Sequence, residues 1–259
     1  MLISTAVVPG PPAFVVELMG SAAHELDDLR HAADLAVSRA VSDLVAAWAD
    51  SPSSDSVSGQ LVVVGPGQPG EYHAAGPVSF ASFGRDVVVP ALIEGQRCDP
   101  GLPTPIMVAR YLASRDLAAH PEHAELWASA RWITTSGGDA TALGEQLRSE
   151  GTLVALILVA DGATCHGPKA PRAQDARAQA YDDGVCAALA SGRPGCLAQF
   201  DGDIGDELGA TGPQVWPVLV AAGGSDGIGE VLWSGAPYGV GWAVAAWRRP
   251  AASATVTHT

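Results

Sequence analysis

The sequence predicts an α/β fold, and three observations support it. Segments typical of strands and helices alternate through the first two-thirds of the 259-residue chain. Leu153–Ala160 is an unbroken apolar run followed by Asp161-Gly162, which is typical of a strand buried on both faces of a sheet. Near the C-terminus, Gly229–Ser234 and Gly241–Trp247 are strand-like and close together, which predicts an antiparallel pair at one end of the sheet.

The other elements follow from the same patterns. Met1–Val8 is a short apolar strand, and it must end where Pro9 begins a Gly- and Pro-rich loop. Gly20–Trp48 is predicted to be a long helix, because its apolar residues recur at intervals of three and four. The further predicted strands are Leu61–Val64, Asp86–Val89 and Trp132–Thr134. The further predicted helices are Thr104–Leu117, Asp139–Ser149, Asp175–Ser191 and Gln214–Ala221, with short helical pieces at Pro194–Phe200 and Ile204–Leu208. The predicted loops are Ser51–Gln60 and Glu71–Gly84.

Composition narrows the range of partners. The formal net charge is −14, from 14 Lys and Arg against 28 Asp and Glu, which argues against nucleic acids and anionic membrane surfaces as partners. No apolar run is as long as a membrane span, and the N-terminal residues lack a basic leader. The four cysteines have no CxxC spacing and are expected to be reduced thiols rather than zinc ligands. We therefore expect a cytoplasmic protein.

The loop after the Leu153–Ala160 strand is the best candidate for a functional site. In open α/β sheets, ligands bind beyond the carboxyl ends of the strands. This loop carries Asp161, His166 and Lys169, and Lys169 could meet an anionic group on a ligand. The alternative is that Asp161-Gly162 is only a turn and that His166 is a solvated loop residue.

Three short motifs have simpler explanations. Gly65–Gly70 matches GxGxxG, but its internal proline argues against the helix that a dinucleotide site requires. Gly223–Gly227 matches GxSxG, but a helix precedes it and a strand follows, the reverse of a nucleophile elbow. His120 and His123 could bind a metal, although the intervening Pro121 favours an exposed loop.

Five segments in order resemble the class III extradiol ring-cleavage dioxygenase superfamily, and in particular an actinobacterial branch of it. The segments are VVPGPP, ELDDLRHAADLAV, LVVVGPG, DGATCHGPKAPR and APYGVGWAVAAW. The resemblance covers about residues 1–248 and implies a single domain over 1–249. The tail at 250–259, PAASATVTHT, consists of small and polar residues and is predicted to be disordered. It also implies a central, mixed but mostly parallel sheet with helices on both faces.

The resemblance further implies an altered metal site. Active members of the family hold ferrous iron with two His and one Glu, which leaves positions for catechol and O₂. This chain has Gly10 where the first His belongs and Gly65-Pro66-Gly67 in the second ligand loop. His166 matches the family's acid/base His. We therefore expect a non-catalytic relative that has lost its iron and binds a small molecule, such as an aromatic ligand, or a protein partner. His166 is in the catalytic position, Asp161, Lys169 and Tyr238 are the expected binding residues, and no metal or other cofactor is expected.

Two alternatives stay open. The chain could be an active, Fe²⁺-dependent ring-cleaving oxidoreductase whose ligands come from residues such as His73, Glu17 or Glu71. It could instead be a scaffold in a paired assembly, because the proteins of this family often associate; a homo-oligomer is expected in that case.

Overall fold

The computed structural model describes residues 1–51, 58–200, 202–224 and 226–250. It contains one seven-stranded sheet with the strand order β3-β6-β2-β7-β1-β9-β8. The parallel strands are β1 (Leu2–Val8), β2 (Gly59–Pro66), β6 (Arg131–Thr135) and β7 (Leu153–Val159). The antiparallel strands are β3 (Gly70–Tyr72) at one edge, and β9 (Trp242–Arg248) and β8 (Ile228–Gly235) at the other. The predicted α/β class, the mostly parallel sheet and the C-terminal antiparallel pair are confirmed.

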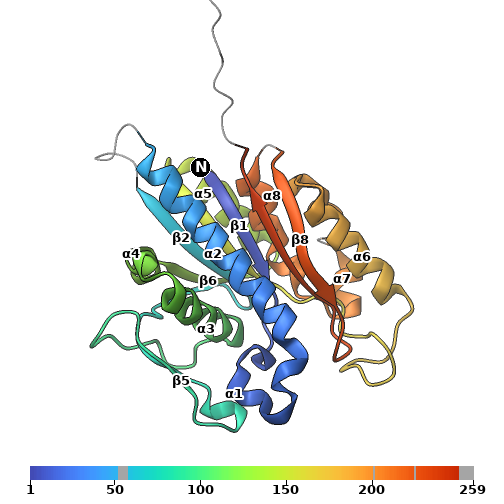
Figure 1. Ribbon diagram of the computed structural model, residues 1–259. Helices are drawn as coiled ribbons and strands as arrows, with labels where there is room; N and C mark the ends of the chain where they lie inside the picture. Colours follow the sequence, from blue (N-terminus) through green and yellow to red (C-terminus); the bar gives the residue numbers. More distant parts are fainter. Residues whose placement is uncertain (52–57, 201, 225, 251–259) are drawn as a thin grey trace, which may run out of the picture.

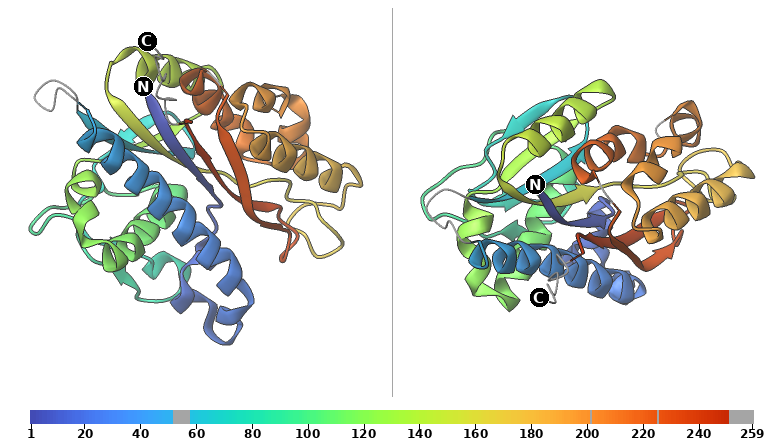
Figure 2. Two further views of the ribbon diagram at one scale, coloured as in Figure 1. Left: turned by 45° about the horizontal axis from the view of Figure 1, so that its top comes forward. Right: turned by 90° about the horizontal axis from the view of Figure 1, so that it is seen from above.

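Helices cover both faces of the sheet, as Figures 1 and 2 show. One face packs against α2 (Asp27–Ala49), α3 (Thr104–Ala119) and α4 (Ala124–Ala128), and the other against α5 (Gly138–Ser149), α6 (Arg177–Ala190) and α8 (Trp216–Gly223). Two short helices are α1 (Val16–Met19) and α7 (Asp203–Leu208), and Leu208 of α7 is buried in the core beneath α5, α6 and α8. None of the helices in the described residues combines the length and apolar character needed to cross a lipid bilayer.

The central strand β7 explains why the sheet needs two helical layers. Every residue of Leu153–Val159 is buried. Leu153, Ala155 and Ile157 contribute to one hydrophobic core, and Val154, Leu156 and Leu158 to the core on the opposite face. Side chains of a strand alternate between faces, so an unbroken apolar run requires packing on both sides.

The structure corrects several predicted boundaries. The long helix begins at Asp27, because Gly20–Leu26 forms a 3-10 helix instead. Within the predicted loop Glu71–Gly84, β3 extends the main sheet, and β4 (Val78–Ser79) pairs with β5 (Val88–Val89) in a separate two-stranded sheet. Pro194–Phe200 is a 3-10 helix. The predicted tail, beyond Pro250, lies outside the described residues.

Candidate functional site

Asp161 stands at the carboxyl end of β7, where several chain segments converge. Its carboxylate oxygen Oδ1 accepts a hydrogen bond of 3.1 Å from the backbone N–H of Gly10, in the loop after β1. Its own N–H donates to Thr211 Oγ1 at 2.8 Å, and the next residue, Gly162, donates to the carbonyl of Gly241 at 2.7 Å. The Gly10 N–H therefore holds the Asp161 side chain, and the loops that carry Thr211 and Gly241 hold the adjoining backbone.

His166 forms a close pair with an acidic residue that the sequence motifs do not single out. The Nε2 atom of His166 lies 2.6 Å from Oδ2 of Asp182, which comes from α6. The backbone N–H of Ala163 donates to the other oxygen of Asp182 at 3.0 Å. The two side chains are only 12% and 15% exposed. A neighbouring carboxylate holds an imidazole in a fixed orientation, which an acid/base group requires.

Two glycines make room for the Asp182 carboxylate. A Cβ atom at Gly162 or at Gly241 would collide with the carboxylate oxygens of Asp182. Both glycines lie in the loops that surround His166, so the backbone approaches the acidic side chain closely from two sides. The His166–Asp182 pair is therefore built from the local backbone as well as from the two side chains.

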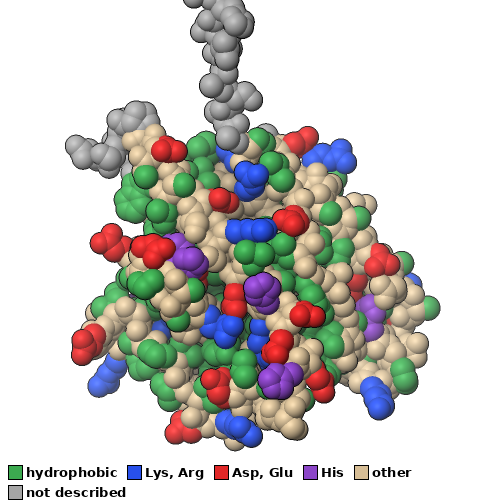
Figure 3. All heavy atoms as spheres, viewed as in Figure 1, with side chains coloured by type: hydrophobic (Ala, Val, Ile, Leu, Met, Phe, Trp, Pro, Cys, Tyr) green, Lys and Arg blue, Asp and Glu red, His purple; other side chains and the backbone are tan. Residues whose placement is uncertain are grey.

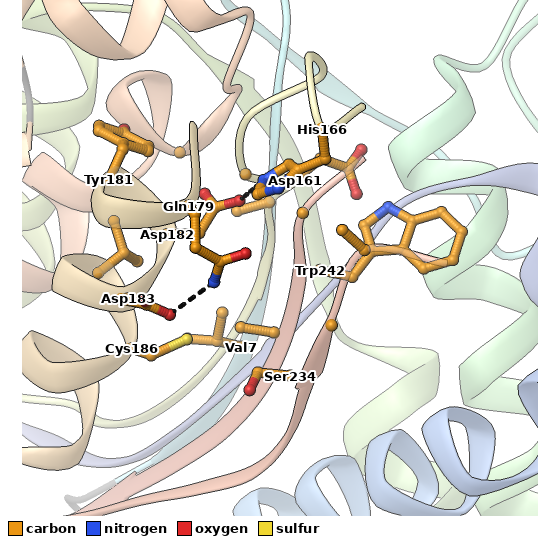
Figure 4. A pocket seen from close by; sticks show the side chains of 18 of the residues that line it. Val7, Asp161, His166, Gln179, Tyr181, Asp182, Asp183, Cys186, Ser234 and Trp242 are labelled. Carbon is orange, nitrogen blue, oxygen red and sulfur yellow. Dashed lines mark hydrogen bonds and ion pairs between the residues drawn. The ribbon is translucent and has the colours of Figure 1, made fainter. Parts of the chain in front are cut away.

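These side chains border a small pocket with a volume of about 150 Å³ (Figure 4). An apolar cavity of about this size can hold one benzene ring. In the view of Figure 4, His166 and Asp182 point toward one another, and Cys186 and Ser234 lie farther along the wall. The lining also includes Asp161, Gln179, Tyr181, Asp183, Val185, Trp216 and Trp242.

The charge of the lining is negative. Burial raises the pKa of Asp161 from 3.8 to about 6, although the Gly10 N–H opposes this rise. Burial also raises the pKa of Asp182, against the effects of the Ala163 N–H and His166. No Lys or Arg lines the pocket among the described residues. The pocket is therefore better suited to a neutral or cationic ligand than to an anionic one.

Two buried indole groups at the pocket have unsatisfied donors. Trp216 and Trp242 are each 4% exposed, and both line the pocket. The Nε1 atoms of both have no hydrogen-bond partner among the described residues. Buried N–H groups usually have partners, so the unpaired Nε1 of Trp216 indicates a place where a ligand or water oxygen could accept. The Trp242 ring points away from the His166–Asp182 pair in Figure 4 and belongs to the core on the other face of the sheet.

The structure brings two of the four predicted site residues together. Asp161 and His166 both line the pocket, whereas Lys169 is exposed and does not. Tyr238 also lies outside the lining; its hydroxyl donates to Glu25 Oε2 at 2.7 Å, and its ring packs edge-on against Trp242. Asp182 was not predicted from the sequence, where its only signal is its place in the helix expected after the site loop.

No family model matches the chain, and no curated protein is significantly similar to it. The extradiol dioxygenase resemblance therefore rests on the quoted sequence segments alone.

The two loops in which the family carries iron-binding His are tightly packed here. A Cβ atom at Gly65 would lie 2.8 Å from Pro105 Cβ, and one at Gly10 would lie 2.7 Å from Val159 Cγ1. Pro105, in the first turn of α3, approaches both glycines. At Gly67, in the same loop, a Cβ atom would come no closer than 3.4 Å to Thr134, but the backbone φ of +153° is one that residues with side chains rarely adopt. The glycines of both loops offer no donor atom, so they do not fit the iron site of the family.

The alternative ligands occupy other positions. His73 is exposed, and its Nε2 lies 3.1 Å from Gln96 Oε1. Arg131 donates two hydrogen bonds to the Glu71 carboxylate, at 2.9 and 3.0 Å, and Glu17 is exposed. None of these three residues belongs to a cluster of metal-ligating side chains within the described residues.

Proposed function

We propose that the protein is a non-catalytic relative of the class III extradiol dioxygenases that binds a small, neutral or cationic aromatic molecule in the pocket beside His166. The observation that carries the proposal is the contrast between the pocket beside His166 and the two glycine loops at the family's iron-ligand positions. The pocket keeps an ordered His–Asp pair, while the glycine loops at the ligand positions pack against Pro105 and Val159.

The chemistry of the pocket supports a ligand with both donor and acceptor groups. Asp161 and the His166–Asp182 pair can accept hydrogen bonds from ligand hydroxyl or ammonium groups. The indole N–H group of Trp216 can donate to a ligand oxygen. An anionic ligand would be repelled by the carboxylates, with no cationic side chain among the described lining residues to offset the repulsion.

Isothermal titration calorimetry with three ring compounds tests this proposal. We expect catechol and benzylamine to bind with one site per chain, and benzoate, the matched anion, to show no measurable binding. Replacing His166 with Ala or Asp182 with Asn should weaken binding, whereas Lys169→Ala, a control outside the pocket, should not. Binding of benzoate alone, or binding unaffected by both pocket variants, would contradict the proposal.

An activity measurement decides between this proposal and the alternative, an active Fe²⁺-dependent ring-cleaving dioxygenase with other ligands. The protein would be purified without chelator, loaded anaerobically with ferrous iron, and then mixed with catechol and O₂ in an oxygen electrode. We expect no oxygen consumption above that of free iron. Sustained consumption that His166→Ala abolishes would establish the enzyme instead. The cytoplasmic location and the homo-oligomer stay predictions; light scattering measures the latter.

A further inference from the structure

A second cluster of side chains, which could bind a metal ion, lies outside the pocket beside His166. His120 follows the end of α3, and Glu122 and His123 lie in the 3-10 helix Pro121–His123 that comes next. One potential donor atom from each of the three residues lies within 4.8 Å of the others. It is the only group of this kind within the part of the chain that the structure describes.

His123 is held as metal-binding histidines usually are. Its Nδ1 lies 2.8 Å from Oδ2 of Asp116, and the same oxygen accepts a hydrogen bond of 2.7 Å from Trp127 Nε1. The side chains of His123 and Asp116 are 2% and 1% exposed. Because the carboxylate accepts from Nδ1–H, the lone pair of the neutral ring is on Nε2. A His that donates to a carboxylate through one nitrogen and binds metal through the other is the common arrangement in metal sites.

The Nε2 atom of His123 has only a weak competitor. Its nearest partner is Ser42 Oγ in α2, at 3.3 Å. A hydroxyl can rotate away from this nitrogen, and at that distance it gives up a long hydrogen bond. The burial of His123 overturns the expectation that both histidines lie in an exposed loop.

His120 and Glu122 can complete the site by side-chain rotation. Their side chains are 37% and 65% exposed, and His120 Nδ1 lies 3.3 Å from Glu122 Oε1. The rings of His120 and His123 are stacked, with centroids 4.9 Å apart. Ligand atoms around a zinc ion lie about 3.4 Å apart, given bonds of about 2.1 Å in tetrahedral geometry. The three donor atoms lie within 4.8 Å of one another, so binding requires the exposed side chains of His120 and Glu122 to rotate toward the buried His123.

Of the three candidate ligands, His120 borders a surface hollow. A groove of about 510 Å³ is lined by residues of α2 and α3, and His120 and Asp116 are part of its wall. The view in Figure 3 shows this side of the molecule, where histidine and acidic side chains are interspersed over α2, α3 and α4. An ion held by three protein ligands at this edge would keep a position open to water or to a ligand in the groove.

We propose that Nε2 of His123, a ring nitrogen of His120 and a carboxylate oxygen of Glu122 bind one divalent transition-metal ion, with Asp116 orienting His123. Two imidazoles and one carboxylate favour Zn²⁺, Co²⁺, Ni²⁺ or Cu²⁺ over Mg²⁺ and Ca²⁺, which prefer all-oxygen sites. This site shares no residue with the pocket beside His166, so the inference stands independently of the proposed function.

Zinc titration of the chelator-treated full-length protein tests the inference. We expect one Zn²⁺ per chain by calorimetry, and His120→Ala and Glu122→Gln should each lower the affinity at least tenfold. Asp116→Asn should lower it about 10- to 100-fold by changing the partner of Nδ1. His24→Ala removes a histidine whose side chain is 92% exposed on another segment, and this control should bind like the wild type.

Two further readouts keep the test decisive. Cobalt-loaded protein should show the visible absorption of Co²⁺ with a low coordination number and with nitrogen and oxygen ligands. His120→Ala should abolish that absorption. No saturable zinc binding below about 100 μM, or the same affinity in wild type, His120→Ala and Glu122→Gln, would overturn the inference. If purified wild type contains iron and His120→Ala does not, that iron belongs to the His120 site. If His120→Ala keeps the iron but no longer binds zinc, the iron is bound elsewhere, and only the proposed function is contradicted.

Discussion

Adding one methyl group at Gly65 should destabilise the protein. An Ala Cβ there would lie 2.8 Å from Pro105 Cβ and 3.0 Å from Pro105 Cγ, closer than such atoms normally approach. Neither side can yield easily, because β2 is paired with β6 and β7 on both sides and Pro105 stands in the first turn of α3. Overpacking of this kind costs about 1–3 kcal/mol, a large part of a typical stability of about 5–15 kcal/mol.

Urea unfolding followed by circular dichroism measures this cost. Gly138→Ala is the matched control: it lies at the start of α5 with nothing within 4 Å of the added atom, so it should be neutral or stabilise by up to about 1 kcal/mol. Replacing Pro105 with Gly should relieve the cost of Gly65→Ala by about 1 kcal/mol in a double-mutant cycle. It should not relieve Gly10→Ala, whose close contact is with Val159 Cγ1. The packing argument is wrong if Gly65→Ala is as stable as Gly138→Ala. It is also wrong if Gly65→Ala lowers the free energy of unfolding by the same amount in the Pro105→Gly background as in the wild type.

Three further predictions concern buried polar groups. Burial raises the pKa of Asp161 from 3.8 to about 6, so the folded protein binds this proton more tightly than the unfolded chain, and the resulting stabilisation below about pH 4 is lost as the pH rises through 6. Asp161→Asn should therefore match wild type in urea unfolding near pH 4 and exceed it above pH 6 by up to about 3 kcal/mol; a difference independent of pH would contradict this. Asp116→Ala leaves the buried donors of His123 and Trp127 without their acceptor and should lower the free energy of unfolding of the metal-free protein by about 3 kcal/mol. Asp116→Asn keeps an acceptor oxygen and should lower it less. Equal losses would refute the role of Asp116 as the acceptor for both donors. Burial raises the pKa of the Cys165 thiol, so a thiol reagent at pH 7 should leave it unlabelled in the native protein and label it in urea, and rapid native labelling followed by peptide mapping would show the opposite.

The fold is predictable from the sequence where one local pattern determines the structure. The run Leu153–Ala160 has no polar residue on either face, and only a central strand between two helical layers can bury it. The position of His166 follows from the same strand, because His166 lies in the loop after β7 and must therefore lie beyond the carboxyl ends of the parallel strands. Short elements are less predictable: β3 has only three residues, and its place at the sheet edge depends on pairing with β6.

The remaining part of the site depends on contacts between residues that are distant in the sequence. Asp182 reaches His166 only because α6 packs back against the loop after β7, and 16 residues separate them. Trp216 and Trp242 come from α8 and β9, and the sequence contains no sign that both residues line one pocket. The glycines beside Asp182 are equally uninformative in the sequence, because their value is the absence of a side chain at a close contact.

Glycines also explain why two neighbouring parts of the fold differ in what they can do. At Gly10 and Gly65 the missing side chains let the strand ends and Pro105 approach closely, so the space that an imidazole would need is filled by apolar atoms. At Gly162 and Gly241 the missing side chains instead admit the Asp182 carboxylate, which holds His166 at the pocket. A single Gly→His replacement in the first pair would therefore meet a steric barrier before it could restore a ligand. At Gly10 and Gly65, close packing therefore adds to the absence of donor atoms in the proposed loss of iron chemistry, while ligand binding beside His166 needs none of that space.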